Sequence, residues 1–363
     1  MEKPMKILDR YIIKKFLSTY VFAILAITLI IIIFDTSQRI DNFVSKQVPL
    51  SAIIFDFYGN FIPYLVNIFS ALFTFIAVIF FTSKMASHTE IVAMLSNGVS
   101  MGRIMRPYLM VATFIALANC YLANVVIPPA SVRRYNFEEK YLKNPYQNRD
   151  RHIHRQTQQG YFAYIESFNV RNQTAYSFSL EHIDDDGLTA KLTSNEAVWD
   201  TATNAWHVSQ YVIRTITDSG EVIRTGASLD TTINLTGKDL SVRVNKLVET
   251  MGYREINDYI NMLKLQGASN VDEMLIEKHK RFAYPMASII LTIIGVALSS
   301  RKMRGGMGLH IGLGVGLSFS YILFQRFSEM FVQGGWLTPA IALWIPNVLF
   351  LFIAIWLYRT APQ

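Results

Sequence analysis

The stretch that decides the fold begins with PPASVRRYNF (residues 128–137) and ends with LIEKHKR (residues 275–281). It is long and polar, and it separates two groups of three apolar runs. Each run is about as long as a helix needs to cross the hydrocarbon core of a membrane, near 20 residues. Backbone groups in lipid must bond to one another, so we expect helices. The runs cover residues 16–34, 61–81, 104–127, 282–299, 311–331 and 339–358.

The composition supports a membrane protein that also carries a separate domain. Hydrophobic residues make up 51% of the 363 residues, and the mean hydropathy is +0.25, which is too apolar for an ordinary soluble protein. The basic head resembles a signal peptide. However, its apolar core is too long and no small-residue cleavage site follows, so we expect a retained anchor. With Cys120 as the one cysteine, the polar stretch must fold by its own core.

The polar stretch itself reads as antiparallel β structure, either a sandwich or a jelly-roll-like fold. Strand-like runs alternate with turn signals such as Asp186-Gly187 and Thr203-Asn204. From Tyr253 the spacing of Ile256, Ile260 and Leu263 predicts a helix. The expected strands are 161–168, 174–183, 189–199, 206–217 and 221–233.

These patterns predict a membrane α-helical fold with six transmembrane helices, three before and three after an inserted extracytoplasmic β domain. Residues 1–127 form the first transmembrane half and residues 128–252 form the β domain. Residues 253–281 form a helical return linker, and residues 282–363 form the second transmembrane half.

Basic residues in the short loops predict the orientation. They crowd one side, whereas the other side has only Arg39 and Lys46 in the 35–60 loop. Because Lys and Arg favour cytoplasmic loops, both termini are expected in the cytoplasm and the β domain in the periplasm. The crowded side holds Lys3, Lys6, Arg10, Lys14, Lys15, Lys84, Arg103, Arg106, Arg301, Lys302, Arg304 and Arg359.

Residues 84–103 predict a short cytoplasmic helix that lies across the membrane face, with a plain connecting loop as the alternative. Ile91, Met94 and Leu95 share one helical face, and Glu90 adds polarity. Asn97-Gly98 is a plausible helix stop.

Gly308, Gly312 and Gly316 recur every four residues and form one smooth stripe on the fifth expected span. Such a stripe allows another helix to approach closely. The neighbour is either a helix of this chain, or a second subunit or sliding helix.

Lys278, Lys280 and Arg281 lie at the outer mouth of the fourth expected span, against the orientation rule. They are either anchors whose charged ends reach the membrane surface, or ligands for an anion such as a phosphate.

Sequence signatures of an enzyme are missing. The chain has no Walker A sequence, no Gly-x-Ser-x-Gly and no His-Glu-x-x-His, so we predict no catalytic residues, no metal and no cofactor. The net charge of +7 is explained by basic residues beside membrane spans, so nucleic acid is not an expected partner.

Motifs along nearly the whole chain, together with the order of its parts, resemble the LptF/LptG (YjgP/YjgQ) family of lipopolysaccharide export permeases. The motifs are Leu8-Asp9-Arg10-Tyr11-Ile12, Glu90-Ile91-Val92-Ala93-Met94, Ser96-Asn97-Gly98, Tyr164-Ile165-Glu166, Trp199-Asp200 with Trp206, Gly306-Met307-Gly308 and Trp344-Ile345-Pro346.

The resemblance implies an inner-membrane ABC transporter subunit that extracts lipopolysaccharide and passes it to a periplasmic bridge for export to the outer membrane. Its implied partners are a second permease of the same kind, a cytoplasmic LptB-like ATPase dimer that hydrolyses the ATP, and an LptC-like bridge protein. The alternative is a membrane-anchored extracytoplasmic sensor or scaffold without transport activity.

The resemblance also implies two sets of site residues. Glu90, with Ile91 and Met94, lies in the loop helix that would couple to the ATPase. Basic residues at the outer face would hold the lipid A phosphates, and the candidates are Arg39, Lys46, Lys278, Lys280 and Arg281.

Overall fold

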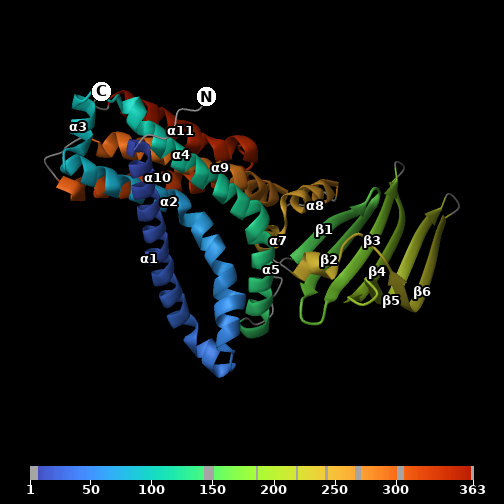
Figure 1. Cartoon of the computed structure of the whole chain (residues 1–363). Coiled ribbons are helices and arrows are strands. Elements are labelled where there is room, and N and C mark those ends of the chain that lie inside the picture. The colour runs from blue at the N-terminus through green and yellow to red at the C-terminus, as the bar shows by residue number, and fades with distance from the viewer. Residues whose placement is uncertain are drawn as a thin grey trace, which may run out of the picture. The chain divides into compact units, whose positions relative to one another are not determined.

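A computed structural model describes residues 7–142, 151–184, 187–217, 220–241, 244–265, 271–300 and 306–360. The chain forms two compact units. One joins Met1–Phe137 with Leu275–Gln363 and is helical, and we call it the membrane unit. The other, Glu138–Met274, carries the strands, and we call it the β unit (Figure 1).

Among the described residues, five helical segments are long and apolar enough to cross a membrane, so the helical membrane class is confirmed. The remaining predicted span falls in α10 (Gly306–Gln333), whose 28 residues are also long enough. Its second half carries the polar residues Gln325, Arg326 and Glu329. The five segments are Ile7–Ser45, Ala52–Ser87, Met101–Leu142, Val271–Ser299 and Pro339–Arg359.

The predicted outer loop at 35–60 is wrong for most of its length. Helix α1 (Ile7–Ser45) continues through its polar end, and a π-helical segment, η1 (Ala52–Tyr58), leads directly into α2 (Gly59–Ser87). Asp35 is the reason, because it accepts bonds from Arg39 Nε at 2.9 Å and from the Tyr58 hydroxyl at 3.0 Å. These contacts satisfy polar groups that the sequence pattern assigned to water.

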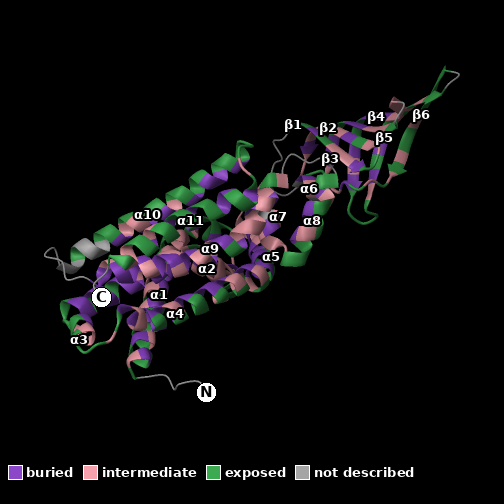
Figure 2. Cartoon of the chain, turned by 90° about the horizontal axis from the view of Figure 1, so that it is seen from above, coloured by how far each residue is buried: buried purple, intermediate pink, exposed green. Residues whose placement is uncertain are grey.

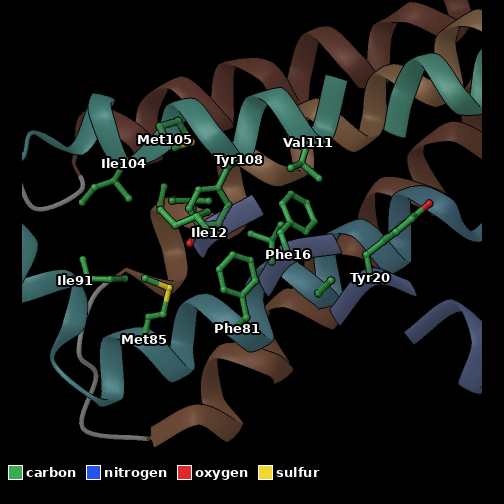
Figure 3. Close-up of a cluster of buried hydrophobic side chains, with 14 of the residues drawn as sticks. Ile12, Phe16, Tyr20, Phe81, Met85, Ile91, Ile104, Met105, Tyr108 and Val111 are labelled. Carbon is green, nitrogen blue, oxygen red and sulfur yellow. The ribbon is translucent and has the colours of Figure 1, made fainter. Parts of the chain in front are cut away.

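The membrane unit has an apolar core formed by α1, α2 and α4 (Met101–Tyr121). The rings of Phe16, Phe81 and Tyr108 meet at centroid distances of 5.1 to 6.0 Å (Figure 3). A second core cluster joins α2 to α9 (Val271–Ser299), α10 and α11 (Pro339–Arg359). Figure 2 shows exposed positions along α10 and α11. Phe319 and Phe327 of α10 and Phe352 of α11 are exposed. Those apolar side chains suit a lipid or subunit contact.

The helix that follows α4 does not end at the predicted domain boundary near residue 128. It continues through η2 (Leu122–Val126), α5 (Ile127–Phe137) and η3 (Glu138–Leu142). Pro128 and Pro129 directly follow the π-helical turn η2, and both lack the N–H that would bond to the preceding turn of a continuous helix.

The β unit contains one six-stranded sheet in which every described pair joins consecutive antiparallel strands. The five predicted strands are confirmed, and β1 was missed. A jelly roll pairs strands that are distant in sequence, so this connectivity does not confirm the jelly-roll prediction. The strands are β1 (Arg151–Gln158), β2 (Tyr161–Asn169), β3 (Thr174–Asp184), β4 (Gly187–Asp200), β5 (Ala205–Thr217) and β6 (Gly220–Thr231).

Trp206 is at the centre of the β unit's core. It is fully buried, contacts the rings of Phe178 and Trp199, and donates from Nε1 to the Leu235 carbonyl at 2.8 Å. Short helices follow the sheet, and in α8 the predicted face of Ile256, Ile260 and Leu263 is buried as expected. These helices are α6 (Gly237–Ser241), α7 (Val244–Thr250) and α8 (Tyr253–Leu265).

Candidate functional site

Helix α3 (Glu90–Ser96) lies between α2 and α4, inside the predicted range 84–103 but shorter than that range. Thr89 precedes it with φ of 59°, a left-handed conformation that is unusual for a β-branched residue. Thr89 lies in the two-residue turn, His88 and Thr89, between the end of α2 at Ser87 and the start of α3 at Glu90.

The end of α3 is a Schellman motif, in which two backbone N–H groups close the last turn. Gly98 N–H donates to the Leu95 carbonyl at 2.9 Å, and Val99 N–H donates to the Met94 carbonyl at 3.1 Å. Gly98 has φ of 79°, which glycine adopts at little cost. The predicted stop at Asn97-Gly98 is therefore confirmed.

Two of the three predicted coupling residues anchor α3 rather than form its outer face. Ile91 is 1% exposed and packs into the core cluster with Ile12 and Ile104, as Figure 3 shows. Met94 is half-buried against the same cluster. The opposite face, with Val92 at 49% exposed, is open to a partner.

A salt bridge joins the base of α1 to the start of α4. Both guanidinium nitrogens of Arg103 donate to the Asp9 carboxylate, at 2.5 and 2.7 Å. Asp9 is buried at 7% exposed, so this bidentate pair is what makes its charge tolerable. Ser100 caps α4 by accepting the Arg103 N–H, which helps place that residue.

Glu90 also connects α3 to α1. Its carboxylate accepts the Tyr11 hydroxyl at 3.1 Å and lies 4.0 Å from His88 Nδ1. Its side chain remains 34% exposed, which leaves it accessible to a partner as well. We call Asp9, Tyr11, Glu90 and Arg103 the α1 clasp. Sequence reasoning missed three of its members, although Asp9 and Tyr11 lie in a motif that carries the family resemblance.

The basic candidates on α1 differ in their surroundings. Arg39 is paired with Asp35 and lies 5.2 Å from the ring centroid of Phe57. Lys46 is exposed in the turn after α1. Arg39 is therefore engaged in a contact within the chain, whereas Lys46 has no ion pair in the described ranges.

The basic candidates on α9 are also divided. Lys280 lies between two carboxylates, 2.7 Å from Glu277 and 3.1 Å from Glu329, and its side chain is 14% exposed. Tyr284 donates to Glu329 as well, so this cluster ties α9 to α10. Arg281 is buried and Lys278 is half-buried. No described contact brings these residues to Arg39 or Lys46.

The glycine stripe is open within this chain. A Cβ added at Gly308, Gly312 or Gly316 would meet nothing within 4 Å. The close approach occurs at Gly314, where an added Cβ would lie 2.0 Å from Ile79 Cδ1 of α2. Of the two readings of the stripe, packing inside the described part of the chain has no support.

These features define a multi-pass membrane protein with an inserted antiparallel β unit and a short helix clasped to its first span. A comparison with curated proteins gives no match. The family model described as lipopolysaccharide export system permease LptF/LptG matches residues 10–360. The chain belongs to this family, whose members are transport permeases.

Proposed function

We propose that the chain is a transmembrane permease subunit of an ABC transporter that extracts lipopolysaccharide from the inner membrane. It has six spans, cytoplasmic termini and a periplasmic β unit. It works with a second permease of the same kind, a cytoplasmic LptB-like ATPase dimer and an LptC-like periplasmic bridge. The family match over residues 10–360 carries this proposal.

The α1 clasp supports a route for ATP-driven motion into the membrane. The ATPase would dock on the exposed face of α3 around Val92 and on Glu90. Because Ile91 is buried beside Ile12 and Glu90 bonds to Tyr11, a shift of α3 pulls directly on the base of α1. The Asp9–Arg103 pair links the same turn of α1 to α4. The two helices therefore move together with α3.

The β5–β6 end of the sheet supports contact with acyl chains. Val212, Ile216 and Ile223 are 37 to 62% exposed, and the pairing of β5 with β6 places them on one face of the sheet. Exposed apolar groups on neighbouring strands suit a lipid tail. For the phosphates, Lys46 and Lys278 are the best of the proposed residues, because neither has an ion pair among the residues that the structure describes.

Co-purification tests the proposal. The full-length tagged chain is expressed at native level in its own host and isolated in mild detergent, and its partners and bound lipid are identified by mass spectrometry. We expect an ABC ATPase, a second permease and lipopolysaccharide. Recovery of the intact chain with neither the ATPase nor lipopolysaccharide would leave the sensor or scaffold alternative.

A further inference from the structure

A small cavity lies inside the membrane unit, where α2, α4, α9 and α10 approach one another. Its volume is about 40 Å³. Its lining is unusually polar for a membrane interior, since it includes serine, asparagine, glutamine and tyrosine side chains from all four helices. The polar lining residues used below are Ser70, Asn119, Ser288, Ser318, Tyr321 and Gln325.

Most of these polar groups bond to one another. Ser70 Oγ lies 2.7 Å from the Tyr20 hydroxyl and accepts from Asn119 Nδ2 at 2.5 Å. The Tyr321 hydroxyl donates to Asn347 at 2.6 Å and accepts from Gln325 at 2.7 Å. The cavity is thus bordered by two networks whose geometry is fixed by bonds within the protein.

Two hydroxyls differ from the rest. Ser288 is 0% exposed and Ser318 is 1% exposed, and neither Oγ has a hydrogen-bond partner in the described ranges. A serine in a helix can bond to the carbonyl four residues earlier, as Ser320 does to Gly316 at 2.9 Å. Ser288 and Ser318 form no such bond, although an unpaired hydroxyl in an apolar interior is costly.

The size of the cavity decides what can satisfy them. One water needs about 10–15 Å³ of this kind of volume and two to four polar partners, so a cavity of about 40 Å³ holds about three or four waters. A lipid headgroup or an acyl chain is far too large. We propose that the cavity is a binding site for ordered water, with the hydroxyls of Ser288 and Ser318 as its ligands and the two bonded networks as its walls.

The bound water would also support α10. Its inner face, with Ser318, Tyr321 and Gln325, rests on exchangeable water at this level rather than only on packed side chains. Water in the cavity requires neither the transported lipid nor the ATPase.

Hydroxyl-radical labelling in ¹⁸O water gives a direct test on the full-length protein in lipid nanodiscs. Radicals formed from a bound water label side chains beside it, even when those side chains are buried. Tyr321 lines the cavity and Tyr108 lies in the other core cluster, and both are at most 1% exposed. We expect Tyr321 to be labelled several-fold faster than Tyr108. Equal, low rates for the two tyrosines would overturn the proposal.

A second test measures whether removing the two hydroxyls raises or lowers the melting temperature. If the two hydroxyls were dry and unpaired, the double variant Ser288→Ala with Ser318→Ala would melt at a higher temperature than the wild type. With water bound, we expect its melting temperature to be unchanged or lower. Ser320→Ala is the matched control, since its hydroxyl bonds on the exposed side of α10. A clear rise in the double variant alone would also overturn the proposal.

Discussion

At the scale of single residues, Asp9 is the most constrained charge near α3. Its carboxylate is buried and is matched by a guanidinium from a helix that begins more than 90 residues later. Removing Arg103 would leave the Asp9 charge buried without its partner, which is costly. The pair therefore fixes which turn of α1 faces α4.

We predict that Asp9→Asn reduces lipid-stimulated ATP hydrolysis several-fold while the ATPase still binds. The reason is that α3 keeps its exposed face, but α1 is no longer held to α4. Pull-down and hydrolysis assays on the purified complex measure the two effects. The exchange of Asp9→Arg with Arg103→Asp should recover part of the activity, and Arg106→Asp on the exposed side of α4 is the control. Normal coupling in Asp9→Asn would contradict the clasp.

Glu90 leads to a different result, because it faces both the clasp and the proposed ATPase. Glu90→Lys replaces attraction by repulsion and should release the ATPase, whereas Glu90→Gln can still accept the Tyr11 hydroxyl and should do less. A charge-assisted contact is worth about 1.5–3 kcal/mol, so the affinity should fall at least tenfold in Glu90→Lys. ATPase retained at wild-type level by that variant would rule out docking through this residue.

At the scale of elements, local patterns predicted five helical segments that can span a membrane, five of the six strands and the stop of α3. Those features depend on apolar periodicity and turn residues, and both signals come from residues that are close together in the sequence. The extension of α1 and the α1 clasp depend on Asp35 with Tyr58 and on Asp9 with Arg103. Such partners are far apart in sequence and leave no periodic signal, so they could not be predicted.

Helix α10 gives the clearest contrast, because both of its faces carry small residues. Periodicity placed Gly312 and Gly316 on one face but could not say which face is inside. The structure turns Gly314 toward α2 and leaves the stripe open.

We predict that Gly312→Leu and Gly314→Leu fail in different ways. Gly314→Leu must displace Ile79, which is buried, so the variant should melt at a lower temperature even as a single chain. Gly312→Leu should fold normally but yield less assembled complex, since its side chain would block a partner helix. Thermal melting of the isolated chain and size-exclusion chromatography of the complex separate the two. Wild-type assembly of Gly312→Leu would show that the stripe faces lipid.

At the scale of the whole molecule, the membrane unit is assembled from two distant parts of the chain, and the β unit is inserted between them. The proposed orientation places the β unit on one side of the membrane and α3 on the other. Under the proposed function, work on α3 would in this way reach a lipid at the opposite surface.

Cysteine labelling checks that orientation. In a Cys120→Ser background, Ala202→Cys marks the exposed turn between β4 and β5, and Ser96→Cys marks the exposed end of α3. We expect a membrane-impermeant maleimide to label Ala202→Cys once the outer membrane is permeabilised. Ser96→Cys should react only after the inner membrane is opened. The reverse order would invert the topology.

The pairing of consecutive strands also affects the order in which the two units fold during synthesis. Each strand pairs with its immediate predecessor, so loop closure is short and the β unit needs nothing made after it. In contrast, Phe75 and Ile79 of α2 cannot be covered until α9 and α10 emerge.

We expect nascent chains stalled soon after α8 to contain a protease-resistant fragment spanning β1–β6, while α2 is still accessible to cross-linking by the insertion machinery. A sheet that became resistant only after α11 was complete would reverse this order. The apolar face of α2 is thus left to a chaperone or to lipid for the time that the ribosome takes to synthesise the whole β unit.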